Sequence, residues 1–167
     1  MKYCFPTEIS IRAEVLLKKC RAKCVKLSTT ESCTGGLLSG CLTDIVGSSD
    51  VLERGFVTYS NQAKHEELGV NIDSLEKYGA VSDRVAIEMC KGALRRNGVE
   101  LVVSLTGIAG PAGGTEFKPV GLVYIGIGTK LEEPIAHKYI FRGDRYEIRT
   151  SAVLKAIELL TITVDEI

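Results

Sequence analysis

The sequence of 167 residues predicts an α/β protein, a three-layer α/β/α sandwich built around a mixed β-sheet. Short apolar runs alternate with longer amphipathic segments, which is typical of this class. The runs at 121–128 and 135–141 follow each other without a helix between them, so we expect them to pair antiparallel. The length is that of one domain, and we predict a single domain over residues 1–167.

The first third of the chain is predicted to form a helix, a strand and a second helix. Residues 7–22 show one apolar face and end in basic residues, with Thr7 as the expected N-cap. Residues 24–30 are predicted as a strand and residues 34–44 as the next helix. Ser32 is therefore expected in a turn that joins a strand to a helix.

The elements that follow are short. Residues 55–59 are predicted as a strand, followed by a brief helix that Ser60 or Asn61 caps and that stops near Gly69. This placement puts Lys64 in the first turn of the brief helix.

The second half of the chain contains the clearest elements. A strongly amphipathic helix is predicted to open at Ser82 and to close at Gly98, and residues 101–105 are predicted as a buried strand. After the antiparallel pair, a final helix is expected from about Tyr146. The helices together suffice to cover both faces of the sheet.

Composition limits the possible functions. Twenty-one basic and 21 acidic residues balance, so no overall field attracts nucleic acid or an anionic membrane. No apolar run approaches the ~18 residues of a membrane span, and no signal-like segment opens the chain. The six cysteines form no CxxC pair, so we expect reduced thiols, a cytoplasmic protein, and neither a disulfide nor a metal site.

The first candidate site is the turn ESCTGG, which begins at Glu31. A serine hydroxyl becomes a nucleophile when a neighbouring base takes its proton, and lysine is that base on several unrelated folds. Backbone N–H groups of residues 33–36 are expected to open the next helix and could stabilise an oxyanion. The alternative is that Ser32 or Thr34 only caps that helix.

The candidate base is Lys64, which follows Tyr59 closely in the sequence. The partial positive charge at a helix N-terminus disfavours an ammonium group, so the pKa of Lys64 is expected to fall. The alternative is a solvated surface lysine, the more common fate of this residue type. His65 is left out of the predicted site, because HEELG lacks the second histidine of a zinc motif.

A glycine-rich segment, TGIAGPAGGT, directly follows the predicted buried strand. Its backbone N–H groups could hold a phosphate, and Lys118 would add positive charge. The segment has neither a Walker ending nor a dinucleotide-binding GxGxxG, so a connector without a ligand is the alternative.

Two arginines, Arg142 and Arg145, occur where the last strand passes into the last helix. Their side chains could clamp a phosphate or a carboxylate. Asp144 is the expected helix cap. Arg149 follows one turn after Arg145, and a solvated charged face is the default interpretation of this pattern.

Five segments in order, ESCTGG, VGSSDVLERGFVTYSNQAK, LTGIAGPAGGT, KPVGLVYIGI and FRGDRYEIR, resemble the C-terminal domain of the CinA family over about residues 8–160. The family is known as a nicotinamide-nucleotide amidohydrolase, a deamidase of nicotinamide mononucleotide. Many members carry a further N-terminal domain that resembles a molybdopterin-binding domain, for which this chain is too short. The resemblance therefore implies a stand-alone, homo-oligomeric deamidase.

The resemblance also implies roles for individual residues. Ser32, Lys64 and Tyr59 match the family's catalytic positions. Substrate binding is implied for Cys33, Thr34, Gly35, Gly36, Thr106, Gly107, Gly110, Gly113, Gly114, Arg142 and Arg145. Between the start of the glycine-rich segment and the KPVG that follows it, Ala112 and Phe117 depart from the family pattern.

The predicted reaction is hydrolysis of nicotinamide mononucleotide to nicotinate mononucleotide and ammonia. Ser32 attacks the carboxamide and Lys64 accepts its proton, without a metal or organic cofactor. The expected partners are the pyridine nucleotide and further copies of the chain. Two alternatives stay open: a nucleotide-binding or regulatory module without turnover, and an interaction protein tied to DNA uptake or damage, which the balanced charge does not favour.

Overall fold

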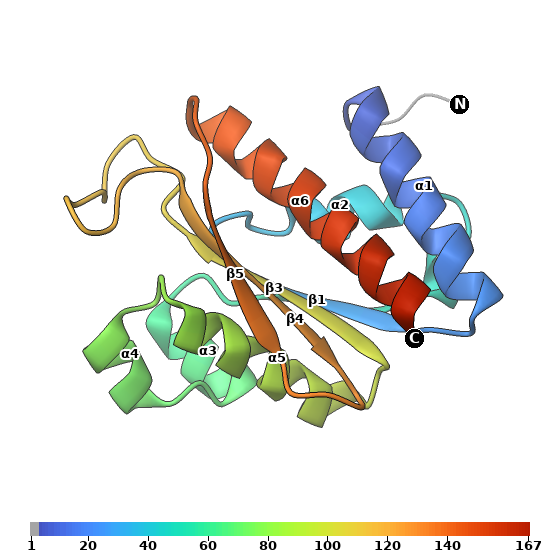
Figure 1. Cartoon of the computed structure of the whole chain (residues 1–167), viewed down its shortest axis with the longest axis horizontal. Helices are drawn as coiled ribbons and strands as arrows, with labels where there is room; N and C mark the ends of the chain where they lie inside the picture. The colour runs from blue at the N-terminus through green and yellow to red at the C-terminus, as the bar shows by residue number, and fades with distance from the viewer. Residues whose placement is uncertain (1–3) are drawn as a thin grey trace.

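The centre of the protein is a five-stranded sheet with the strand order β2-β1-β3-β4-β5 (Figure 1). The structure is a computed structural model that describes residues 4–167. The strands are β1 (Leu27–Glu31), β2 (Leu52–Val57), β3 (Leu101–Gly107), β4 (Leu122–Thr129) and β5 (Ile135–Ile140). All five residues of β1 are buried, as expected of a strand near the middle of a sheet that is covered on both faces.

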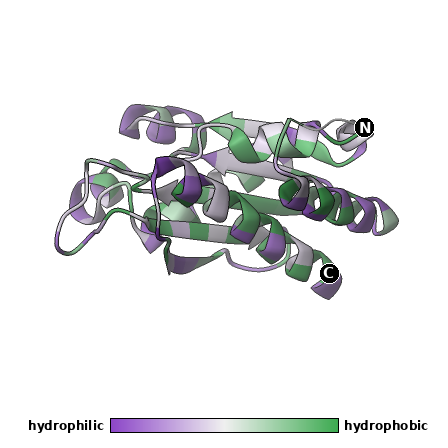
Figure 2. Ribbon diagram, turned by 90° about the horizontal axis from the view of Figure 1, so that it is seen from above, coloured by the Kyte–Doolittle hydropathy of each residue, from purple (hydrophilic) through white to green (hydrophobic). Residues whose placement is uncertain are grey.

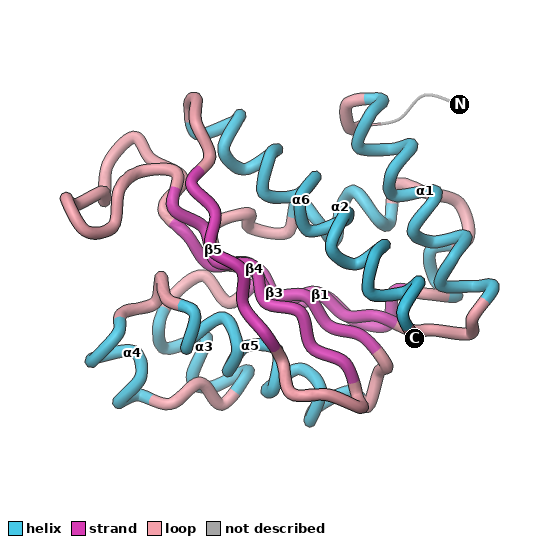
Figure 3. The backbone as a smooth tube through the Cα atoms, viewed as in Figure 1, coloured by secondary structure: helices cyan, strands magenta, loops and turns pink. Residues whose placement is uncertain are grey.

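The sheet is mixed, as predicted. β1 pairs in parallel with β2 and β3, whereas β4 is antiparallel to both β3 and β5. The strands lie side by side (Figure 3), and their pairing places the carboxyl ends of β1, β2, β3 and β5 at one edge of the sheet. Ligands of open α/β sheets bind at such an edge.

Helices cover both faces of the sheet, which confirms the predicted three-layer sandwich (Figure 1). On one face, α1 (Thr7–Ala22), α2 (Leu37–Thr43) and α6 (Arg145–Glu166) enclose the larger apolar core. On the other, α3 (Asn61–Leu68), α4 (Ile72–Tyr78) and α5 (Asp83–Asn97) enclose a smaller one. Hydrophobic and hydrophilic residues alternate along the helices (Figure 2), as expected of helices with one face on the sheet and another in solvent. Within residues 4–167, none of the helices has the length and apolar character that crossing a membrane requires.

The connections between the parallel strands diverge at the carboxyl end of β1. The chain leaves β1 through α2 to reach β2 on one side, and it then passes through α3, α4 and α5 to reach β3 on the other side. Loops that follow neighbouring parallel strands in this way open a crevice between them. The residues after β1, β2 and β3 therefore meet at one place.

Three predicted elements begin three residues away from the expected position. The strand predicted at residues 55–59 is β2, which spans Leu52–Val57 because it pairs with β1 from Leu52 onward. The helix after Ser32 begins at Leu37 rather than at residue 34, because Gly35 and Gly36 adopt φ values of 59° and 92° and keep residues 33–36 in a turn. The first strand begins at Leu27 rather than at residue 24, because Cys24 has a φ of 55° and turns the chain before the strand starts.

The prediction of Thr7 as a cap is wrong, since Pro6 occupies the N-cap position of α1 and no side chain caps it. Two short elements were not predicted, α4 and the 3-10 turn Ser48–Asp50. Seven residues and three residues are too few for a periodic apolar pattern to show. By contrast, Ser60 and Ser82 cap α3 and α5 as predicted.

The close approach of α5 to α3 gives a test of the packing. A Cβ atom at Gly92 of α5 would lie 2.0 Å from the carbonyl oxygen of Leu68 in α3. We expect Gly92→Ala to lower the free energy of unfolding by about 1–3 kcal/mol, because the two helices must move apart. Urea unfolding followed by circular dichroism measures this change.

Gly40→Ala in α2 is the matched control for Gly92→Ala. A methyl group there meets only the end of the Phe5 ring, at 3.3 Å. The gain in helix propensity of roughly 1 kcal/mol should offset that contact. Equal stabilities of the two variants would contradict the tight packing of α5 on α3.

Candidate active site

Ser32 and Lys64 are in direct contact in the crevice at the carboxyl end of β1. Lys64 Nζ lies 2.8 Å from Ser32 Oγ, and it donates hydrogen bonds to the carbonyl oxygens of Thr58 at 2.8 Å and Tyr59 at 3.2 Å. Lys64 is 1% exposed and Ser32 is 8% exposed. The alternative of a solvated surface lysine is therefore wrong.

The ends of two adjacent strands bring this pair together. The N–H group of Thr58 donates to the carbonyl of Glu31 at 2.9 Å, so the residues after β2 lie beside those after β1. Ser60 caps α3 immediately afterwards. Lys64, in the first turn of α3, then reaches back across the strand ends to Ser32.

The amine of Lys64 is arranged for proton exchange with Ser32. Burial lowers the pKa of Lys64 from its ordinary 10.5 to about 8, because desolvation disfavours the ammonium form. The two carbonyl oxygens can only accept, so they hold two of the amine hydrogens. The third position on Nζ points at Ser32 Oγ. It carries an N–H in the ammonium form and the lone pair in the free amine. A proton can therefore pass between the two atoms along one hydrogen bond.

Of the four backbone N–H groups expected to serve a substrate, one remains available. Gly35 N donates to the carbonyl of Ser32 at 3.0 Å, and Gly36 N donates to the carboxylate of Glu31 at 3.0 Å. The N–H groups of Cys33 and Thr34 have no partner within residues 4–167, but Thr34 is fully buried. The expected set of donors at residues 33–36 is therefore corrected to the Cys33 N–H.

Glu31 shapes this turn, a role that the sequence analysis missed. Its buried carboxylate accepts hydrogen bonds of 2.7–3.1 Å from the N–H groups of Gly36, Leu38 and Ser39 and from the Ser39 hydroxyl. It thereby satisfies the first N–H groups of α2 from inside the chain. A glutamate at the end of a strand, shortly before a Gly-Gly pair and a helix, is the signal that could have revealed it.

The thiol beside Ser32 is not a competing nucleophile. Cys33 is 7% exposed, and burial raises the pKa of its thiol to about 11. The thiolate is the reactive form of cysteine, and it is scarce at neutral pH when the pKa is so high. The hydroxyl of Ser32 is the group in this turn that has a base in contact.

A cavity of about 230 Å³ opens onto the Ser32–Lys64 pair. The predicted site residues that line it come from four separate segments of the chain: Ser32, Cys33, Tyr59, Lys64, Thr106, Gly107 and Arg145. Ala109 of the glycine-rich segment also lines it, as do Ala80 and Val81, which the sequence analysis missed because no motif marks them.

Other predicted binding residues lie away from this cavity. Gly113, Gly114 and Arg142 are exposed and line neither this cavity nor its neighbour. Thr34, Gly35, Gly36 and Gly110 support the walls through their backbone groups.

Arg145 separates this cavity from a larger one. Its guanidinium donates to the carbonyl of Gly110 at 2.9 Å and to the Tyr59 hydroxyl at 3.4 Å. The larger cavity, of about 690 Å³, lies at the start of α6, and Arg149 also lines it. The carboxylate of Asp144 caps α6 as predicted, and it accepts a hydrogen bond from the N–H group of Glu147 at the start of that helix. The positive charge beside the larger cavity is therefore that of the arginine side chains.

Two basic residues hold backbone groups, contrary to expectation. Arg149 was assigned to a solvated face, but it is half-buried and donates to two carbonyl oxygens of the turn after Ser32. Lys118 was expected to offer charge to a ligand. Its Nζ instead donates to the carbonyl oxygens of Tyr78 and Val81 at 2.6 and 2.7 Å, which braces the segment between α4 and α5.

A family model, the CinA C-terminal domain, matches residues 10–164. The chain belongs to the CinA family. The resemblance seen in the five sequence segments is thereby confirmed.

Relatives of this CinA-family chain include the nicotinamide-nucleotide amidohydrolase PncC of Enterobacter agglomerans, which is 46% identical over 151 residues, 90% of each chain. The protein of the same name from Escherichia coli is 43% identical over 154 residues, which are 92% of this chain and 93% of that one. A longer relative, a CinA-like protein of Syntrophobacter fumaroxidans, is 48% identical over 147 residues, or 88% of this chain. The chain spans 34% of the length of that protein.

Solved structures of the CinA superfamily share the fold. The competence/damage inducible protein CihA from Agrobacterium tumefaciens has a TM-score of 0.94 at 42% identity, with 99% of both chains covered. A superfamily protein from Escherichia coli has a TM-score of 0.88 at 34% identity, with 96% of this chain and 94% of that one covered. The α/β architecture of this CinA-family chain is therefore that of its relatives.

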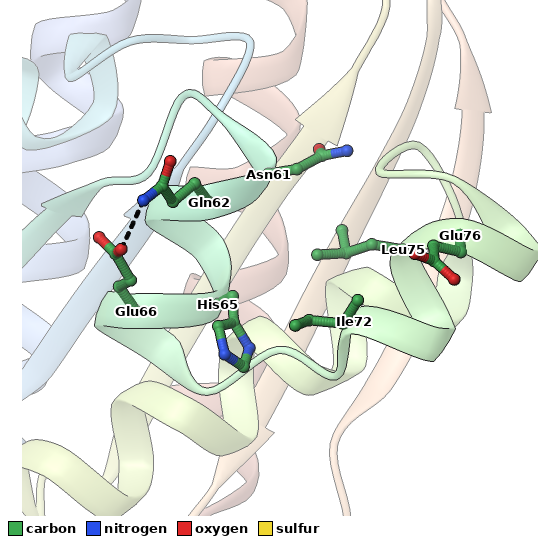
Figure 4. Close-up of a pocket in the computed structure, with 7 residues that line it drawn as sticks. All are labelled: Asn61, Gln62, His65, Glu66, Ile72, Leu75 and Glu76. Atoms are coloured by element: carbon green, nitrogen blue, oxygen red, sulfur yellow. Dashed lines mark hydrogen bonds between the residues drawn. The ribbon is translucent and has the colours of Figure 1, made fainter.

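A separate cavity of about 480 Å³ lies between α3 and α4 (Figure 4). His65 and Glu66 line it from α3, and Ile72 and Glu76 line it from α4. The ring of His65 has Nδ1 2.9 Å from the carbonyl oxygen of Val70. His65 therefore borders a cavity other than the one above Ser32.

The low pKa of Lys64 makes the stability of this CinA-family domain depend on pH. Between about pH 8 and 10.5, the folded chain has released a proton that the unfolded chain still holds. The free energy of unfolding of the wild type should therefore rise with pH across this window, relative to that of Lys64→Met. Urea unfolding at a series of pH values measures the difference.

Lys138→Met, which replaces an exposed lysine of β5, is the control, and its free energy of unfolding should follow that of the wild type. Parallel pH profiles of the wild type and Lys64→Met would contradict the assigned pKa.

Proposed function

We propose that this chain hydrolyses the carboxamide of nicotinamide mononucleotide to give nicotinate mononucleotide and ammonia. The observation that carries the proposal is the 2.8 Å contact between Ser32 Oγ and the buried amine of Lys64. Two relatives that cover nine tenths or more of this chain bear the name nicotinamide-nucleotide amidohydrolase. A hydroxyl paired with a base of low pKa is the equipment that acyl transfer from an amide needs.

In the first step of the proposed reaction, the free amine of Lys64 takes the proton of Ser32 Oγ. Oγ forms a bond to the carboxamide carbon, and the carbonyl electron pair moves onto its oxygen. The N–H group of Cys33, which lines the cavity and has no partner within residues 4–167, is the donor available to that oxyanion. Its position directly after the nucleophile supports this role.

The second step releases ammonia. The oxyanion re-forms the carbonyl as the carbon–nitrogen bond breaks, and the Lys64 ammonium gives its proton to the departing nitrogen. Because the pKa of Lys64 is about 8, the same group can accept a proton in one step and return it in the next at neutral pH. The products are ammonia and an ester between Ser32 and the nicotinoyl group.

Water then hydrolyses the ester. Lys64 takes a proton from the attacking water, and it returns that proton to Oγ when the ester bond breaks. Tyr59 lines the cavity and its hydroxyl is exposed toward Arg145, so we assign it to the proton path or to substrate contact. Each step uses groups of the chain, the substrate and water, without a metal or organic cofactor.

Arg145 supports recognition of the nucleotide part of the substrate. The carboxamide has to reach Ser32 in the cavity of about 230 Å³, and the neighbouring cavity of about 690 Å³ offers room for a sugar phosphate. Arg145 lines both cavities, and a guanidinium pairs well with phosphate oxygens. We therefore assign phosphate binding to Arg145.

The nucleophile and the base are tested by ammonia release. Ser32→Ala and Lys64→Met are each expected to lower kcat for nicotinamide mononucleotide at least ~10³-fold, because the two groups act as a unit. Wild-type kcat/KM should rise with pH through about 8, as the Lys64 amine loses its proton.

Ser151→Ala in α6 is the matched control and should keep full activity. Undiminished turnover by folded Ser32→Ala would rule out the proposed nucleophile, and tight substrate binding without ammonia from the wild type would favour a regulatory module.

The phosphate contact is tested by comparing two substrates. Arg145→Met should raise KM for nicotinamide mononucleotide about tenfold or more, since a charged hydrogen bond contributes roughly 1.5–3 kcal/mol. The same variant should change KM for nicotinamide riboside, which lacks the phosphate, by less than about twofold. Steady-state ammonia assays give both values. Equal effects on the two substrates would show that Arg145 does not bind the phosphate.

A further inference from the structure

Arg149 reaches the nucleophile turn from a distant part of the chain. It lies in the second turn of α6, one turn after Arg145, and its side chain is half-buried. Arg149 Nε donates to the carbonyl oxygen of Cys33 at 3.1 Å, and Nη2 donates to that of Thr34 at 2.8 Å. The planar guanidinium thus holds two successive carbonyl groups directly after Ser32.

The two peptides on either side of Cys33 are both held by hydrogen bonds. In a trans peptide, the C=O of one residue and the N–H of the next lie in one plane and point in opposite directions. The carbonyl of Ser32, held by Gly35 N at 3.0 Å, therefore sets the direction of the Cys33 N–H. Arg149 holds the next peptide through the carbonyl of Cys33, so the backbone of Cys33 is fixed on both sides.

The N–H groups of Cys33 and Thr34 are those of the turn that remain without a partner within residues 4–167. The other two are occupied by the carbonyl of Ser32 and the carboxylate of Glu31. Thr34 is fully buried, whereas Cys33 lines the cavity above Ser32, so the Cys33 N–H is the donor at the site. A donor that is fixed before the reaction is what oxyanion stabilisation requires.

We propose that Arg149 is a positioning residue, which keeps the Cys33 N–H in place for the oxyanion of the acyl-transfer step by holding the carbonyl oxygens of Cys33 and Thr34. The inference rests on Ser32 as the nucleophile of the proposed function. Arg149 itself does not touch the reacting atoms. Its removal should slow the chemical step and leave binding of the planar ground state nearly unchanged.

The test uses a fluorophosphonate probe, which forms an Oγ–P bond with Ser32 and releases fluoride, and whose adduct presents an oxygen where the oxyanion forms. The rate of labelling at Ser32, read by mass spectrometry, is compared in the wild type, Arg149→Met, Arg149→Lys and Arg12→Met. Arg12 forms an exposed pair with Glu8 on α1 and is the matched control. Turnover of nicotinamide mononucleotide and affinity for nicotinate mononucleotide are measured in parallel.

We expect Arg149→Met to be labelled about 10- to 100-fold more slowly than the wild type, which is less than the loss of a whole oxyanion donor. Its kcat should fall by a similar factor, while KM and the affinity for nicotinate mononucleotide stay within about threefold. Arg149→Lys keeps the charge but not the fork of two donors and should be intermediate, and Arg12→Met should match the wild type.

Wild-type labelling rates in folded Arg149→Met would overturn the positioning role, as would a loss confined to KM. If circular dichroism shows that Arg149→Met is unfolded, Arg149→Lys decides, and a wild-type rate in that variant overturns the role. Labelling of the wild type at Ser32 without turnover of nicotinamide mononucleotide overturns the proposed substrate only. Failure of both labelling and turnover in the wild type overturns both proposals.

Discussion

The buried amine of Lys64 is the constraint on which the rest of the site depends. Removing an amine from water costs free energy unless its hydrogens have acceptors and its positive charge is paired or lost by deprotonation. Here three oxygen atoms lie within 3.2 Å of Nζ, and the pKa falls to about 8. Two of these oxygens belong to the backbone just after β2. The position of the amine is therefore set by a strand end, and the flexible side chain of lysine is held at both of its ends.

Most charged side chains in this crevice hold the backbone of the protein. Glu31 satisfies the first N–H groups of α2, Arg149 holds two carbonyl groups after Ser32, and Lys118 holds the segment before α5. Arg145 also contacts a carbonyl group, but it remains exposed between the two cavities. A rigid frame of this kind keeps the small cavity above Ser32 open, while the polar groups of its walls keep their hydrogen-bond partners.

How much the sequence could predict differs from element to element. The helix after Ser82 was predictable because an N-cap, a long apolar face and a closing glycine all agree, and each of these signals is local. The seven-residue helix α4 and the turn after Ser32 were not, since a short helix has no periodicity and the glycines there delay α2 by three residues. Ala80 and Val81 line the cavity only because the fold places their segment beside β3, so no motif could mark them.

The sequence by itself determined the α/β class, the strand-to-helix junctions that carry Ser32 and Lys64, and membership of the CinA family. Those features follow from residue periodicity, capping and ordered motifs, which are local properties of the chain. Only the tertiary structure decided that the hydroxyl contacts the amine, that the Cys33 N–H has no partner in the described part of the chain, and that Arg149 holds a carbonyl group 115 residues before it. Such contacts depend on the order and direction of the strands and on how deeply each side chain is buried. The spacing of residues along the chain determines neither the strand order nor the burial.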